Sequence, residues 1–223
     1  MQHKILFQPS EALVHVYLAE NEEIQAEAGA MVFKSWNVEI ETSTKGGVFG
    51  ALKKSVLGGE SFFTNKFIAR QGTGEIGFAA PFMGDIKHFN LQNQTMYIQS
   101  GSYVCSSVSV VTDTSFTGAK GFFGGTGLFM LKATGTGDLF LNSFGAIFEK
   151  KLENDRFICD TGHIVAFTDG LTFDVKKVGG LKSTLLSGEG LVAEFNGTGT
   201  LWIQTRNPGS FFSWIAPHVT TGK

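Results

Sequence analysis

The segment MLKATGTGDLFL, residues 130–141, decides the fold class, because the same pattern occurs three times in the chain. The other copies are FIARQGTGEIGF at residues 67–78 and VAEFNGTGTLWI at residues 192–203. Their first glycines, Gly72, Gly135 and Gly197, are 63 and 62 residues apart. Apolar residues precede and follow each Gly-Thr-Gly, and such self-similarity at a fixed period indicates one supersecondary unit used three times.

Two further landmarks repeat in step with this one. Gly29, Gly101 and Gly162 each precede an apolar stretch, and the strings APFMG, NSFG and RNPGS follow the three copies. The glycine-rich stretch KGGVFGALKKSVLGG, residues 45–59, lengthens only the first copy. We therefore predict one domain over residues 10–216, made of repeats at 10–84, 85–147 and 148–216.

The segments between these landmarks have the character of strands. VEIET (residues 38–42) and VSVVT (residues 108–112) are short and β-branched, and turn residues bound them. Because glycine enters positive φ without steric cost, we expect each Gly-Thr-Gly to form a hairpin turn. Helical periodicity is weak throughout. The sequence predicts an all-β protein of three sandwich-like units, about 62 residues each, in a pseudo-threefold arrangement.

Composition excludes several classes of function. The 223 residues carry a formal net charge of −2, and the basic residues are dispersed, so nucleic acid is not an expected partner. The longest apolar runs are too short for a spanning helix, and the first residues resemble neither a signal peptide nor a transit peptide. The two cysteines, 54 residues apart, form no disulfide framework. We expect a cytoplasmic protein.

Motifs for cofactors and metals are missing. The chain contains no Gly-x-x-x-x-Gly-Lys-Ser/Thr phosphate loop, and its five histidines form no short-spaced ligand pair, so no cofactor or metal is expected. One stretch with mixed chemistry, CDTGH, holds Cys159, Asp160 and His163 as a candidate ligand or nucleophile site. The alternative is that Cys159 is a small buried side chain and His163 a strand-edge residue.

Aromatic residues beside glycine or serine turns are the other notable feature. Apolar side chains in turns are covered by something, either the protein's own core or a partner. We predict that they form an interface for self-association, with capping of the sheet ends as the alternative. The candidate interface residues are Phe49, Leu52, Phe122, Phe123, Phe211, Phe212 and Trp214.

The chain resembles a known family over nearly its whole length. AEAGAMVFKS, the glycine-rich insertion with its Gly-Thr-Gly, and GLFMLKATGTGDLFL occur in the order typical of the mitochondrial biogenesis family named for altered inheritance of mitochondria, protein twenty-four, once catalogued as a domain of unknown function. The resemblance implies a triplicated relative of the tryptophan RNA-binding attenuation protein fold, a small β-sandwich, in the group of tryptophan RNA-binding attenuation protein-like and double-stranded β-helix folds. It implies no reaction, cofactor or catalytic residue.

The function expected from the sequence is therefore non-enzymatic. We predict a scaffold or interaction module that forms homo-oligomers or binds a protein partner. The alternatives are a small-ligand binder or enzyme with its site in a groove between repeats, and, less favoured, an RNA-binding or membrane-surface protein.

Overall fold

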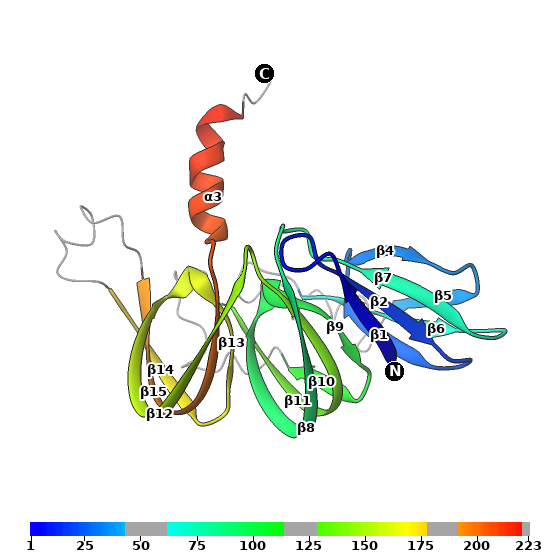
Figure 1. Cartoon of the computed structure of the whole chain (residues 1–223), viewed down its shortest axis with the longest axis horizontal. Coiled ribbons are helices and arrows are strands. Elements are labelled where there is room, and N and C mark those ends of the chain that lie inside the picture. Colours follow the sequence, from blue (N-terminus) through cyan, green and yellow to red (C-terminus); the bar gives the residue numbers. More distant parts are fainter. Residues whose placement is uncertain (43–61, 114–128, 178–190, 220–223) are drawn as a thin grey trace, which may run out of the picture.

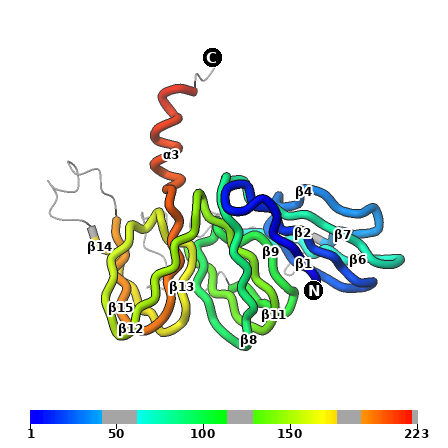
Figure 2. The backbone as a smooth tube through the Cα atoms, in the orientation of Figure 1, coloured from blue at the N-terminus to red at the C-terminus, as the bar shows by residue number. Residues whose placement is uncertain are grey.

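The computed structural model describes residues 1–42, 62–113, 129–177 and 191–219. Within these ranges strands predominate, which confirms the all-β prediction, and a single α-helix follows the last strand. Successive segments of the chain lie in a row, from the blue and cyan strands β1–β7 through the green strands β8–β11 to the yellow-green to orange strands β12–β15 (Figure 1). The helix α3 projects from this row toward the C-terminus (Figure 2).

The described residues of the first segment form seven strands. They are β1 (Gln2–Leu6), β2 (Leu13–Leu18), β3 (Glu23–Glu27), β4 (Met31–Lys34), β5 (Val38–Thr42), β6 (Thr64–Ala69) and β7 (Gly74–Phe78). The middle and last segments contain longer strands and two short 3-10 turns. They are β8 (Ile86–Gln99), η1 (Ser100–Ser102), β9 (Tyr103–Ser107), β10 (Val110–Asp113), β11 (Met130–Asn142), β12 (Ile147–Asp160), η2 (Thr161–His163), β13 (Ile164–Thr168), β14 (Leu171–Lys177) and β15 (Leu191–Gln204). The chain then forms α3 (Pro208–Ile215) and η3 (Ala216–His218).

The strands form two sheets in which all strand pairs are antiparallel. A four-stranded sheet has the order β1-β2-β7-β4. An eleven-stranded sheet follows the path β12-β15-β13-β8-β11-β9-β3-β6-β5, with β10 added to β11 and β14 added to β15. The larger sheet therefore runs through all three segments. No helix within the described ranges combines the length and apolar character that crossing a bilayer requires.

The Gly-Thr-Gly segments are not hairpin turns, so that expectation is wrong. β11 continues straight through Gly135 and β15 through Gly197, and the register with β8 shifts by one residue just after Gly135. The φ angles of these two glycines are 133° and 126°, values that L side chains rarely adopt. In the first copy β6 and β7 lie in different sheets. The glycines therefore bend a long strand and do not reverse it.

Each bend is matched by a left-handed asparagine on the opposite strand. Asn93 in β8 has a φ of 55° and Asn154 in β12 a φ of 50°. The Asn93 amide donates to Thr136 Oγ1 at 3.0 Å, and the Asn154 amide donates to Thr198 Oγ1 at 2.9 Å. The threonines of the second and third Gly-Thr-Gly thus pair the backbone groups that the bulges leave free.

The buried core crosses from one segment to the next. One cluster packs first-segment residues such as Phe67 and Phe78, whose ring centroids are 5.2 Å apart, against Phe140 of β11. A second cluster packs middle-segment residues such as Tyr103 against Val165 of β13. The apolar contacts between segments therefore hold the row together as one body.

Two strand pairs join successive segments with the same geometry. β3 pairs with β9, placing Gln25 opposite Ser106 and Ala26 opposite Cys105. β8 pairs with β13 in the same way. There Tyr97 lies opposite Phe167 and Ile98 opposite Ala166. In each case a short strand that follows a turn adds to the end of a strand of the preceding segment.

Candidate functional site

The structure uses Cys159, Asp160 and His163 in local contacts. The Cys159 thiol is buried at the end of β12 and lies 3.3 Å from the carbonyl oxygen of Asp160. Burial, with a smaller contribution from Asp160, raises the pKa of this thiol to about 12. The Asp160 carboxylate accepts from the Gly162 amide at 2.8 Å and so caps η2.

His163 points its hydrogen bond elsewhere. Its Nδ1 donates to the backbone carbonyl oxygen of Gln204 at 2.7 Å, and the side-chain amide of Gln204 donates to the carbonyl oxygen of Gly162 at 2.9 Å. The thiol and the imidazole are therefore each paired with backbone oxygens, and a nucleophile needs a base beside it. These hydrogen bonds cap the turn η2 and join it to Gln204 of β15, which is enough to explain them. The ligand site at Cys159, Asp160 and His163 stays a prediction.

Of the predicted interface residues, Phe49, Leu52, Phe122 and Phe123 lie outside the described residues. The other three belong to α3, where we expected a loop, so that expectation is wrong. The helix forms because the Asn207 side chain accepts from the amides of Gly209 and Ser210, at 2.8 and 3.3 Å, and Pro208 follows as the first helical residue.

The aromatic residues of α3 divide between two environments. Phe211 packs on Phe144, with ring centroids 5.3 Å apart, and with Met83 borders a hollow of about 500 Å³. Phe212 and Trp214 are mostly exposed. The start of α3 therefore contacts the rest of the protein through Phe211 on Phe144 and Phe212 near Phe82, and Trp214 borders the same hollow as Phe211. Whether these rings form an interface stays a prediction.

A side-chain cluster that the sequence analysis missed lies where the first segment meets the second. His3 of β1, His88 of β8 and Asp138 of β11 come together, with one potential ligand atom of each within 4.8 Å of the others. His88 Nε2 donates to Asp138 Oδ1 at 2.7 Å. Both imidazoles pack on Phe140, with ring centroids 4.8 Å from its ring. Burial lowers the pKa of His3, and the adjacent His88 lowers it further.

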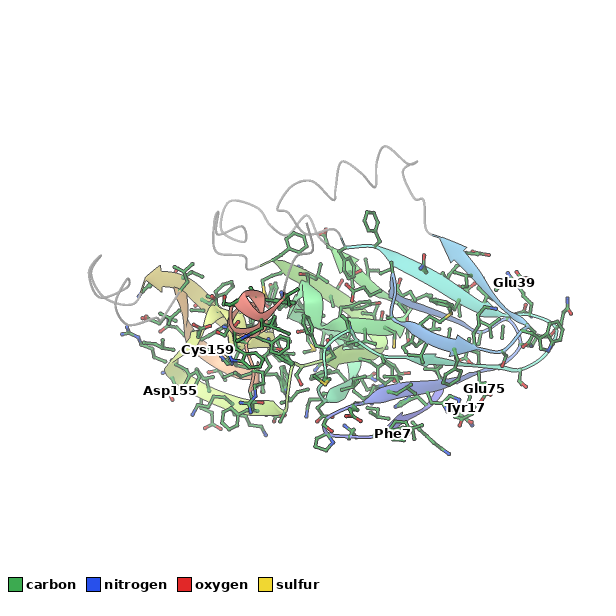
Figure 3. All side chains as sticks on the ribbon, turned by 90° about the horizontal axis from the view of Figure 1, so that it is seen from above. Phe7, Tyr17, Glu39, Glu75, Asp155 and Cys159 are labelled. Atoms are coloured by element: carbon green, nitrogen blue, oxygen red, sulfur yellow. The ribbon has the colours of Figure 1, made fainter. Side chains whose placement is uncertain are left out.

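The two ends of the row present strand edges with exposed apolar side chains. β4, at one end, pairs with β7 but with no second strand among the described residues. Met31, Val32 and Phe33 on β4 are 38%, 54% and 38% exposed. At the other end, Ile158 on β12 is 54% exposed. Glu75, on the neighbour of β4, and Cys159 of β12 lie toward opposite ends of the molecule (Figure 3).

Comparison with known proteins identifies the family. The family model described as Mitochondrial biogenesis AIM24 matches residues 3–206, nearly the whole described chain. The chain belongs to the AIM24 family. An uncharacterised protein of Streptococcus pyogenes serotype M6 is 27% identical over 217 residues, which cover 94% of this chain and 87% of that protein.

The fold also has a counterpart among solved structures. A crystal structure of a Streptococcus pyogenes protein matches with a TM-score of 0.83 and 26% sequence identity, covering 98% of this chain and 99% of that one. These two relatives bring no assigned activity with them. An account of the function of this AIM24-family chain therefore depends on its own geometry.

Proposed function

We propose that this chain is a self-assembling scaffold made of three equivalent β units, in which the free edge of the last unit of one copy pairs with the free edge of the first unit of the next. The units are the repeats predicted at residues 10–84, 85–147 and 148–216. The observation that carries the proposal is the identical register of the two junctions between units.

The strand pairing supports three equivalent units. In each, two long strands pair with one another and two short strands pair with the second long strand. In the first unit each long strand is divided in two. β2 and β3 together correspond to the first long strand, and β6 and β7 together correspond to the second. In the first unit the pairs are β3–β6, β5–β6, β2–β7 and β4–β7. In the second unit they are β8–β11, β9–β11 and β10–β11. In the third unit they are β12–β15, β13–β15 and β14–β15.

A shared irregularity supports the same equivalence. β4 omits Val32 from its pairing with β7, β9 omits Val104 from its pairing with β11, and β13 omits Val165 from its pairing with β15. A bulge at one equivalent position in three strands is a specific feature, since bulges re-aim a strand and interrupt its pairing. β4, β9 and β13 therefore occupy the same place in their units.

The two junctions define what a third pairing would be. β9 and β13 each pair with a strand of the preceding unit, whereas β4 pairs only with β7 among the described strands. In the same register, β4 would pair with the end of β12 of another copy. Lys34 would then lie opposite Ile158, as Ser106 lies opposite Gln25, and Phe33 opposite Cys159, as Cys105 lies opposite Ala26.

Burial is consistent with this partner. The middle-unit equivalents of Met31, Val32 and Phe33 are Tyr103, Val104 and Cys105, and all three are 0% exposed. The same three positions on β4 are exposed and apolar, and no described strand pairs with the outer side of β4, an edge of the kind that proteins normally cover. Because the two surfaces differ, the contact is head-to-tail, and copies would close into a ring or extend into a filament.

The proposal is tested by one substitution on the β12 edge with a matched control. Ile158→Lys places a charge in the predicted pairing, whereas Ile40→Lys changes an isoleucine of similar exposure, 43%, on β5, whose equivalents β10 and β14 join no units. Both are surface changes expected to shift stability by no more than about 0.5 kcal/mol.

Light scattering after gel filtration measures the outcome. We expect the wild-type chain and Ile40→Lys to have a mass that is a multiple of the 24.1 kDa monomer, and Ile158→Lys to be monomeric. A wild-type chain that stays monomeric at all concentrations overturns the proposal, as does an Ile158→Lys variant that assembles normally.

A further inference from the structure

The cluster of His3, His88 and Asp138 has the composition of a metal site. Imidazole nitrogens and carboxylate oxygens are ligands for zinc and the neighbouring divalent transition metals. Zinc–nitrogen bonds of about 2.0–2.1 Å place ligand atoms roughly 3–4 Å apart. The three atoms here lie within 4.8 Å of one another, so a contraction on the order of 1 Å closes the set around an ion.

One atom of the cluster lacks an ordinary explanation. His3 Nδ1 is buried and makes no hydrogen bond of ordinary geometry, although the imidazole interacts with the backbone of Met1. A buried polar atom left unpaired costs about 1–3 kcal/mol, and such atoms in native proteins usually mark a bound water, an ion or a functional group. The packing of both imidazoles on Phe140 fixes the rings but satisfies no nitrogen.

The surroundings would hold and complete such a site. The side-chain amide nitrogen of Asn90 lies 3.4 Å from Asp138 Oδ1. It is in position to orient the carboxylate without being a ligand itself. The His88 and Asp138 side chains are 28% and 13% exposed, which leaves a path for the ion and room for water as a further ligand. The site joins β1 of the first unit to β8 and β11 of the second.

The first unit contains an internal comparison. His15 Nε2 and Glu75 Oε2 are 2.9 Å apart, and His15 lies opposite Gly77 on β7 just as His88 lies opposite Phe140 on β11. There, however, Tyr17 is hydrogen-bonded to His15 Nδ1 at 3.3 Å, and no second imidazole approaches among the described residues. The same histidine–carboxylate pair thus occurs with its nitrogens satisfied and without a third ligand.

We propose that His3, His88 and Asp138 bind one divalent transition-metal ion of the zinc class. The ion takes the place of the Nε2 proton that His88 donates to Asp138, and that proton moves to Nδ1 through solvent, so that a neutral imidazole offers its Nε2 lone pair to the ion. The ion pins the first β strand to the second unit and so stabilises the junction between them.

The experiment measures binding of Co²⁺ and Zn²⁺ to the untagged full-length chain after chelation and dialysis. We expect one ion per chain, a visible Co²⁺ spectrum typical of nitrogen and oxygen ligands, and a higher melting temperature with Zn²⁺. His88→Ala and Asp138→Asn should each weaken binding at least tenfold, because loss of even a residue that only orients a ligand typically costs about 10–100-fold in affinity. His15→Ala, the matched control, should bind as the wild type does.

Folding of the variants is checked separately. His3→Gln changes the outermost strand of its sheet and keeps a polar side chain of similar size, so it should retain the native circular dichroism spectrum and still lose the ion. Dissociation constants weaker than about 1 mM for the wild type overturn the proposal. So does equal binding by the wild type and His88→Ala. Because the site lies within one chain, the Ile158→Lys variant should bind metal normally whether or not the chain assembles.

Discussion

Replacing Gly197 by alanine tests whether the Gly-Thr-Gly bend shapes the long strand β15. Gly197 has a φ of 126°, and a Cβ added there would lie 2.3 Å from the carbonyl oxygen of Gly170. The unusual torsion costs about 1–3 kcal/mol for any L residue. The contact is with backbone, so the β13–β14 turn must move, and overpacking of this kind adds about 1–3 kcal/mol.

Gly72, the equivalent glycine of the first copy, is the control. Its φ is 104°, but a Cβ there would meet no atom within 4 Å. Gly72→Ala therefore carries the torsional cost alone, and Gly197→Ala should be the less stable variant by about 1–3 kcal/mol. In a chain of this size each kcal/mol lowers the melting temperature by about 2–4 °C, so the two variants should differ by about 2–12 °C. Equal melting temperatures in a calorimetric comparison would refute the assignment of a close backbone approach at Gly197.

Two further predictions concern Cys159 and α3. The pKa of the Cys159 thiol is about 12 against an ordinary 9.0, so its reaction with a thiol reagent at pH 8 should be roughly a thousandfold slower than that of an exposed cysteine. The rate should rise about tenfold for each pH unit. Fast labelling of the native chain would instead favour the hypothesis that Cys159 is a nucleophile. Asn207→Ala removes the cap of α3 and should cost that helix about 1 kcal/mol. Because α3 contains no buried residue, amide exchange there should accelerate about fivefold while the melting temperature barely changes; unaltered exchange contradicts the capping role.

The sequence supported the strand assignments well where β-branched residues and turn residues alternate. The expected strand at residues 38–42 is β5, Val38–Thr42, and residues 108–112 overlap β10. The hairpin at Gly-Thr-Gly was wrong because a glycine at positive φ permits a bulge inside a strand as readily as a turn. Only the partner strand, with Asn93 bonded to Thr136, distinguishes the two.

The start of α3 can be predicted from the sequence, but the aromatic residues there were interpreted as turn residues. Asn207 followed by Pro208 is a recognisable start, a capping side chain and then a residue whose φ suits the first helical position. The metal cluster carried no such signal. His3, His88 and Asp138 are brought together by the β8–β11 register and by the position of β1 beside these two strands, and no short spacing in the sequence encodes either. The free edges were equally hidden, because their meaning depends on the register of two internal junctions.

The central claim is that copies pair head to tail, with β4 of one copy beside β12 of another in the register of the β3–β9 and β8–β13 pairs. A disulfide between chains tests this claim most directly. In Lys34→Cys/Ile158→Cys the two cysteines face each other across the proposed contact, and Lys34→Cys/Phe157→Cys is the control because neighbouring residues of a strand point to opposite faces. On mild oxidation the first variant should form covalent dimers and larger multiples of the chain on a non-reducing gel, and the control should remain single chains. Absence of cross-linked species from the first variant, or equal cross-linking of both, would contradict the proposed assembly.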